Sequence, residues 1–230
     1  MTAGAAPALL SNTGLSVEDF GLGEYGEIHR RQLALVEARA EGRAGDTLLI
    51  GEHLPVITCG RAARPTDLLS PVFQTIPVER GGGVTLHAPG QLVAYPIRWL
   101  APRERDLRQL LRALEQAVIE TLAAYGVAGE RREGFSGVWT RLDSGGVCKI
   151  AAVGVAVRRW VTYHGVAFNV NNALSDYAQI RPCGLEAISV TSLAGCLGAP
   201  PPLEGVKRLF TSTLLQQFQQ AQASEETRLR

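Results

Sequence analysis

Apolar residues recur most regularly between Asp106 and Gly126. Within this stretch they fall at every third or fourth position, which is the spacing that gathers side chains on one face of an α-helix. Asp106 can cap the first turn, with Gln109 three residues further on, and Gly126 can end the last turn. The predicted apolar stripe contains Leu107, Leu110, Leu111, Leu114, Val118 and Leu122.

Two further segments have a weaker helical pattern. Residues 205–221 are amphipathic, and three consecutive prolines at positions 200–202 separate them from the rest of the chain. In a helix over residues 25–41, one side would carry the apolar residues Tyr25, Ile28, Leu35 and Val36. We expect a helix at each place.

Short apolar runs bounded by Gly, Pro and Asn predict strands. These runs fall within residues 47–60, 75–83, 91–100, 137–140 and 148–171. The first is expected to be a hairpin that turns near residues 53–55, and the last to be two long strands broken near Arg158 and Arg159. Strands outnumber helices and do not alternate with them, which is typical of an α+β fold with a mixed, largely antiparallel sheet and packed helices.

Length and composition favour one globular domain. The chain has 230 residues, of which 46% are hydrophobic and 20% charged, so it can bury a sizeable core without disulfides or metal. We expect residues 1–14 to be flexible, residues 15–222 to form a single domain and residues 223–230 to be a charged tail.

Charge and hydropathy exclude several classes of partner. The formal net charge is +1, so no basic excess favours nucleic acid. No segment approaches the ~18 apolar residues of a membrane span, and the first residues lack the basic start and apolar core of a signal peptide. Four separated cysteines suit neither a disulfide framework nor a zinc framework, which indicates a reduced, cytoplasmic protein. They are Cys59, Cys148, Cys183 and Cys196.

The histidines do not suggest a metal site. No two of them have the spacing that pairs metal ligands on one helix face, so no metal is expected. His29 and His53 are interpreted as surface or loop residues. His164, beside Gly165, either pairs with a cysteine or is a hydrogen-bonded strand residue.

Lys149 is unusual because this chain takes arginine almost everywhere else. Of 23 lysines and arginines, only Lys149 and Lys207 are lysines. An amine can exchange protons near neutral pH, whereas a guanidinium effectively cannot. Lys149 therefore either reaches water from the end of a strand or lies close to a thiol. If side chains alternate strictly along this strand, the face of Lys149 also carries Ala151, Val153 and Val155. The other face then carries Ile150, Ala152 and Gly154.

Cys183 is the strongest candidate nucleophile. Pro182 and Gly184 flank it and favour a turn, whereas the other three cysteines lie in or beside apolar runs and are interpreted as small buried hydrophobes. Cys148 would point away from any site that Lys149 faces. An ammonium close to a cysteine favours its thiolate, so a lysine–cysteine pair could take and return protons at neutral pH.

Residues 78–97, VERGGGVTLHAPGQLVAYPI, contain three consecutive glycines. They fit neither G-x-x-x-x-G-K-[ST], because no lysine follows, nor G-x-G-x-x-G before a helix, because a strand follows. The segment is either a tight hairpin or a wall where the backbone approaches a ligand. Arg80, Thr85 and His87 favour the wall.

Three segments together resemble the lipoyl(octanoyl) transferase family. RGGGVTLHAPGQLVAYPI is similar to that family's R-G-G-x-x-T-x-H-x-P-G-Q-x-x-x-Y-P. GVWT followed by KIAAVGVAV, and YHGVAFNVN followed by IRPCGLEAISVTSL, match in order and spacing from about Gly51 to Leu193. The resemblance implies one octanoyltransferase catalytic domain with the fold of biotin protein ligases and lipoate ligases.

The resemblance also implies residue roles. Cys183 would form an acyl-thioester, and Lys149 would lower its pKa and move protons. The implied acyl-binding residues are Arg80, Gly81, Gly82, Gly83, Val84, Thr85, Leu86, His87, Ala152, Val153, Gly154, Gly165, Val166 and Ala167. Ala152 replaces a frequent serine, and Ala88 replaces a frequent glycine before Pro89. His87 is interpreted as a positioning group rather than the base.

The implied reaction moves an octanoyl or lipoyl group from acyl carrier protein to a lysine of a lipoyl domain. The acceptors would be E2 subunits of 2-oxoacid dehydrogenases and the H protein of glycine cleavage, and no cofactor is expected. Three alternatives stay open: an ATP-dependent lipoate or biotin ligase, a non-catalytic acyl-binding domain, and a Cys/His hydrolase that uses Cys183 with His87 or His164.

Overall fold

A mixed β-sheet forms the centre of the molecule. The computed structural model describes residues 9–10, 14–142, 145–182 and 190–227, and within these ranges the sheet has eight strands in the order β1-β2-β3-β7-β11-β10-β9-β8. The strands are β1 (Leu9–Leu10), β2 (Ser16–Gly23), β3 (Thr47–His53), β7 (Gln91–Ile97), β8 (Gly129–Arg132), β9 (Phe135–Arg141), β10 (Val147–Arg158) and β11 (Val161–Asn169). β2 and β3 are parallel, and the other neighbouring pairs are antiparallel. The predicted α+β fold is confirmed.

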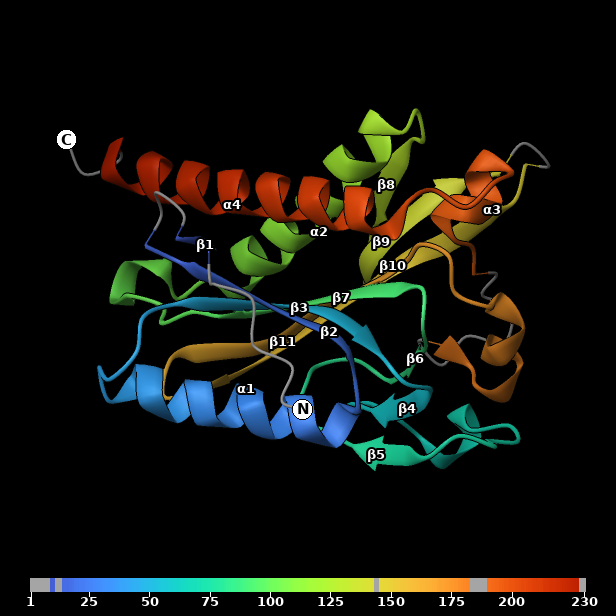
Figure 1. The fold of residues 1–230 in the computed structure, drawn as a ribbon, viewed down its shortest axis with the longest axis horizontal. Coiled ribbons are helices and arrows are strands. Elements are labelled where there is room, and N and C mark those ends of the chain that lie inside the picture. The colour runs from blue at the N-terminus through green and yellow to red at the C-terminus, as the bar shows by residue number, and fades with distance from the viewer. Residues whose placement is uncertain (1–8, 11–13, 143–144, 183–189, 228–230) are drawn as a thin grey trace, which may run out of the picture.

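Helices cover both faces of this sheet. In Figure 1, long helices lie above the sheet and α1 (Tyr25–Ala40) lies below it. The upper helices are α2 (Leu107–Ala124) and α4 (Leu203–Thr227), with the short α3 (Leu193–Leu197) preceding α4. Short 3₁₀ turns occur at η1 (Pro65–Asp67), η2 (Pro102–Glu104) and η3 (Leu174–Gln179).

The core consequently has two layers. The larger layer packs α2 and α4 on the sheet and includes fully buried Leu114, Phe168 and Phe210. The smaller layer lies between α1 and the sheet and includes Val36 and Leu49. Burying a side chain of this size stabilises the fold by roughly 1.5–3 kcal/mol.

The α2 helix follows its predicted pattern closely. Asp106 accepts hydrogen bonds from the backbone N–H groups of Arg108 and Gln109, at 2.8 and 3.2 Å, so it caps the helix as expected. Gly126 follows the helix with φ +76°. Leu107 is the exception to the predicted stripe, because this first helical residue is 40% exposed.

The predicted hairpin at residues 47–60 is wrong. β3 stays in the large sheet, whereas β4 (Val56–Cys59) pairs with β5 (Thr75–Pro77) and β6 (Val84–His87) in a separate sheet. The chain turns out of the large sheet at Leu54, whose N–H donates to the carbonyl of Gly23 on β2. A three-stranded sheet thus holds the segment that follows the glycines beside the ends of β3 and β7, two central strands of the large sheet (Figure 1).

Strict alternation along β10 is also wrong. The register of β10 against β9 shifts between Lys149 and Ala151, which indicates a β-bulge. As a result, Ile150 and Ala151 both pack into the larger core layer, and Val153 follows them. Lys149 is thereby turned to the opposite face, which it shares with Ala152.

The two ends of the chain differ from expectation in detail. β1 lies inside the segment expected to be flexible and pairs with β2. α4 continues to Thr227, into the segment expected to be a charged tail. Among the residues described, no helix has the length and apolar character needed to cross a membrane.

Candidate active site

A cavity opens where the glycine segment lies against β10 and β11. Its wall brings together nearly all of the predicted acyl-binding residues, namely Arg80, Gly81, Gly82, Gly83, Val84, Thr85, His87, Ala152, Val153, Gly154, Gly165, Val166 and Ala167. Lys149 lines the same cavity. Leu86 does not, because alternation along β6 turns it into the small core shared with Ile57 and Ile180.

The glycine segment is held against β10 by its backbone. The N–H of Gly81 donates to the carbonyl of Val155 at 3.0 Å. A Cβ atom on Gly154 would lie 2.8 Å from the carbonyl oxygen of Gly81, so only glycine permits this approach. The glycines therefore shape the wall by bringing two backbone segments together.

Arg80 organises this wall from the inside. Its side chain is buried, and its guanidinium donates to the carbonyls of Gly81, Gly83 and Thr58 and to the Thr58 hydroxyl, at 2.9 to 3.1 Å. A planar guanidinium suits this task because its N–H groups form a rigid fork. These contacts assign Arg80 a structural role in the wall.

His87 is paired through both ring nitrogens. Nδ1 lies 2.8 Å from Oε1 of Gln91, and Nε2 lies 3.2 Å from the hydroxyl of Thr58. The Gln91 amide nitrogen donates to Leu86 O and Asn169 Oδ1, so Oε1 must accept and Nδ1 must carry the proton. Burial holds the pKa of His87 well below its usual range. This geometry agrees with a positioning group.

Lys149 enters the cavity from the opposite side. It is only 5% exposed, and its Nζ donates to the carbonyl of Ser136 at 2.9 Å and lies 5.4 Å from the Trp139 ring centroid. Its stem passes Gly137, which has φ +110° and where a Cβ atom would lie 2.8 Å from Lys149 Cε. Lys149 is thus buried rather than extended toward water.

Cys183 lies outside the described residues, so its predicted contact with Lys149 stays a prediction. The described residues on either side of it are informative. Pro182 and Val190 line a second cavity together with Lys149 and Ala152. The N–H of Thr191 also donates to the Lys149 carbonyl at 2.9 Å. The chain therefore approaches and leaves the Cys183 segment beside Lys149.

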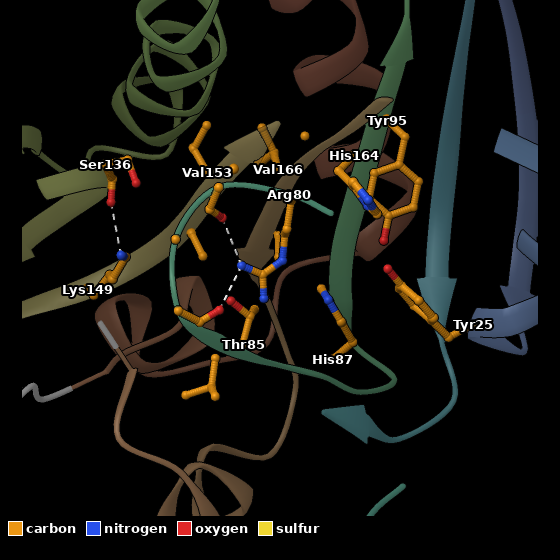
Figure 2. A pocket seen from close by; sticks show the side chains of 18 residues that line it. Tyr25, Arg80, Thr85, His87, Tyr95, Ser136, Lys149, Val153, His164 and Val166 are labelled. Atoms are coloured by element: carbon orange, nitrogen blue, oxygen red, sulfur yellow. Dashed lines mark hydrogen bonds between the residues drawn. The ribbon is translucent and has the colours of Figure 1, made fainter. Parts of the chain in front are cut away.

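Aromatic and imidazole rings form the other end of the cavity. Figure 2 shows Lys149 and Ser136 on one side of Arg80, and Tyr25, Tyr95 and His164 on the other. Tyr25, Tyr95, Ser136 and His164 line the cavity but are not among the implied catalytic or acyl-binding residues. Tyr25 and Tyr95 sit in apolar patterns that also suit an ordinary core, so their sequence gives no signal of the site.

Two buried histidines in this region are held neutral. Burial lowers the pKa of His53 to about 4 and that of His164 to about 3. His53 is fully buried and its Nε2 lies 2.8 Å from the Tyr95 hydroxyl. The expectation that His53 is a surface or loop residue is therefore wrong. His53 is the last residue of β3, and its ring stacks on the ring of Tyr95.

The comparisons with known proteins agree with this arrangement. Residues 24–215 match the model of the lipoyl protein ligase A/B catalytic domain family. The chain belongs to this family. Among the octanoyltransferases, the protein of Geobacter metallireducens is 44% identical over 194 residues, which cover 84% of this chain and 89% of that relative. The predicted membership of the octanoyltransferase family is confirmed.

Solved structures share the fold of this family at low identity. A bi-partite lipoate protein ligase from Thermoplasma acidophilum has a TM-score of 0.63 at 15% identity, covering 83% of this chain and 80% of that one. Biotin protein ligase from Aquifex aeolicus, in complex with biotin and ATP, has a TM-score of 0.57 at 13% identity, covering 88% and 70%. The shared fold predicted with these ligases is confirmed.

Proposed function

We propose that this protein transfers an octanoyl group from octanoyl-acyl carrier protein to a lysine of a lipoyl domain through an acyl-thioester on Cys183. The observation that carries the proposal is the burial of Lys149 in a cavity wall to which Pro182, the residue bonded to Cys183, also contributes. The identity of this chain to octanoyltransferases supports the choice of acyl group.

The first step exchanges one thioester for another. Lys149 accepts the proton of the Cys183 thiol, and the thiolate attacks the carbonyl carbon of the donor. The bond from that carbon to the carrier sulfur then breaks, and the leaving thiolate takes the proton back from Lys149. Because one thioester replaces another, the step needs no ATP.

The second step forms an amide. The ε-amine of the acceptor lysine attacks the acyl-enzyme, the bond to Cys183 Sγ breaks, and the departing sulfur leaves as thiolate. The attacking amine must lose a proton, and a neutral Lys149 can accept it. Burial beside Trp139 and Ser136 keeps this amine away from bulk water.

The acyl chain would occupy the cavity between the glycine segment and strands β10 and β11. Val153, Val166 and Ala167 offer apolar contact there. Each methylene buried contributes about 0.8 kcal/mol, so chain length is measured by how far the cavity extends from the thiol. The buried Arg80 would act indirectly, by holding the glycine wall against β10.

The proposed acceptors are lipoyl domains of 2-oxoacid dehydrogenase E2 subunits and the glycine cleavage H protein. A fold neighbour is described with its E2 lipoyl domain, which supports this class of acceptor. We assign the activity to a single catalytic domain, residues 15–222. We propose a cytoplasmic location because four separated cysteines in the sequence do not suit a disulfide framework.

The test is incubation of the full chain with octanoyl-acyl carrier protein, without ATP. Intact mass and peptide mapping should find one octanoyl adduct, on Cys183, which disappears when a lipoyl domain is added. Cys183→Ala should abolish both adduct and transfer, whereas Cys196→Ala serves as the matched control and should retain them. Full transfer by Cys183→Ala would refute the proposal, and a requirement for ATP would favour a ligase instead.

A further inference from the structure

Three potential metal ligands meet beside the cavity although they are far apart in the sequence. His29 lies on α1, Glu79 directly precedes Arg80, and His164 lies on β11. Among the described residues, their donor atoms form a group in which every pair lies within 4.8 Å. Nε2 of His29 is 3.3 Å from Glu79 Oε2, and Nε2 of His164 is 3.7 Å from the same oxygen.

Both imidazoles have a ring nitrogen in need of a partner. Within the part of the chain that the structure describes, the Nε2 atoms of His29 and His164 are buried and make no hydrogen bond, and a polar atom near both is Glu79 Oε2. His164 is 2% exposed, so water cannot easily satisfy it. A buried polar atom without a partner costs roughly 1–3 kcal/mol in most settings, and such atoms often mark a function.

The backbone at His164 is also unusual. Its φ of +56° lies in the left-handed region, which residues other than glycine rarely adopt. The Gln32 side chain fixes this conformation, because its Oε1 accepts from the His164 N–H at 2.8 Å. The structure thus holds the ring of His164 toward α1, where it stacks on His29 with centroids 5.3 Å apart.

We propose that His29, Glu79 and His164 bind one divalent transition-metal ion, of which Zn²⁺ is the best fit. Two imidazole nitrogens and one carboxylate oxygen are a common ligand set for zinc. At zinc–ligand distances of about 2.0–2.1 Å, ligand atoms of a tetrahedral site are about 3.3 Å apart. The two measured separations from Glu79 Oε2, 3.3 and 3.7 Å, are close to that value.

Small movements complete the site. The two rings are tilted by only 24°, so one must rotate for both lone pairs to meet at one ion. The His29 side chain retains 17% exposure and the Glu79 side chain 54%, which leaves room for adjustment at the outer edge. Water or a small anion would complete a tetrahedral set of ligands.

The ion would connect the acyl cavity to α1. His164 lines the cavity, and Glu79 is bonded to Arg80, which shapes the glycine wall. A bound metal ion would link α1, the glycine wall and β11 through its three ligands. The ion lies away from Lys149, because His164 and Lys149 occupy opposite sides of Arg80 (Figure 2), so it would stabilise the cavity without joining the acyl transfer.

The test measures binding of ZnCl₂ to chelator-treated full chain by calorimetry, with CoCl₂ absorption as a second readout. Cysteines are blocked by alkylation first, because thiols also bind zinc. One ion per chain is expected, with a cobalt spectrum typical of four ligands. His29→Leu and Glu79→Gln should each weaken binding more than about tenfold, since even outer-shell changes cost 10–100-fold.

A matched control keeps the result specific. Glu27→Gln alters another polar residue in the first turn of α1, outside the cluster, and should bind zinc like the unaltered chain. Zinc should also raise the melting temperature of the unaltered chain and of Glu27→Gln, but not of His29→Leu. Equal binding by His29→Leu, or no binding by the unaltered chain at 100-fold excess zinc, would overturn the proposal.

Discussion

The two sides of the cavity differ in how their buried polar groups are used. Lys149 donates to the carbonyl of Ser136 beside the segment that leads to Cys183. On the other side, His87 is bonded through both nitrogens and Arg80 is bonded to the protein's own backbone. In the proposed mechanism the first side moves protons, whereas the hydrogen bonds of the second side hold the shape of the wall.

This difference predicts that substitutions on the two sides have different kinetic signatures. Loss of a proton-transfer group lowers kcat, because its interaction matters most in the transition state. Loss of a shaping group alters stability and KM, because it changes the wall that receives the acyl chain.

Lys149→Ala should produce the largest loss. Removing a general acid–base group typically lowers the rate by about 10²–10⁴, and Lys149→Arg should fail similarly because a guanidinium does not release its proton. The measurement is octanoyl transfer, together with alkylation of Cys183 against pH, which should require higher pH in Lys149→Ala but not in Lys149→Arg, because a guanidinium still favours the thiolate. Transfer within tenfold of the unaltered rate by Lys149→Ala would remove the distinction between the two sides.

Arg80→Lys should act mainly on stability. A lysine keeps the charge but cannot reach the carbonyls of Thr58, Gly81 and Gly83 together. Buried acceptors left unpaired cost about 1–3 kcal/mol each, so we expect a loss of about 3 kcal/mol in denaturant titration. KM for the acyl donor should rise more than kcat falls. Arg61→Lys, at an exposed neighbouring arginine, is the control and should change neither.

Gly137→Ala tests whether the Lys149 side chain needs the space that the missing Cβ atom of Gly137 leaves open. The new Cβ atom would meet Lys149 Cε at 2.8 Å, and alanine is also strained at φ +110°. Gly134→Ala separates the two effects, because Gly134 has φ +80° with no neighbour within 4 Å. The left-handed backbone should cost both variants about 1 kcal/mol of stability. Gly137→Ala should lose more, because its Cβ atom would also overlap the carbonyl oxygen of Ala151. Only Gly137→Ala should also lose transfer activity, by about 10–100-fold; equal activity in the two would contradict the packing argument.

The sequence predicts the elements whose pattern is local. The α2 helix with its Asp106 cap, the break between β10 and β11 at Arg158 and Arg159, and the α+β class all follow from spacing and turn residues. The glycine segment is likewise predicted to form a wall, and the cavity lies there. In each case neighbours in the sequence supply the physical signal.

The rest depends on contacts between distant segments. Nothing in residues 47–60 indicates that β4 leaves the large sheet, because its partners β5 and β6 come later in the chain. The bulge after Lys149 depends on how β10 pairs with β9. It turns the Lys149 side chain into the cavity, which strict alternation of side chains along β10 does not predict. His53 is buried by rings from β2, α1 and β7, which its own loop-like sequence does not reveal.

Acid should weaken the histidine side, and the loss of stability should be graded with pH. The pKa values of His53 and His164 are lowered by burial to about 4 and about 3, below the value of about 6.5 in an unfolded chain. At pH 7 both states are unprotonated and the two residues contribute no pH dependence. Below about pH 6.5, His53 and His164 bind protons in the unfolded chain but not in the folded chain, so the free energy of unfolding falls as pH falls.

Each of these histidines should contribute a slope of about 1.4 kcal/mol per pH unit between about pH 6 and 5. Denaturant titrations across that window measure the slope. His53→Gln should lower stability at pH 7, because the bond to Tyr95 changes, yet its slope should be shallower by one histidine. A slope that stays the same in His53→Gln would mean that His53 is not held neutral, and the contrast between a proton-moving side and a shape-holding side would then rest on His87 and Arg80 alone.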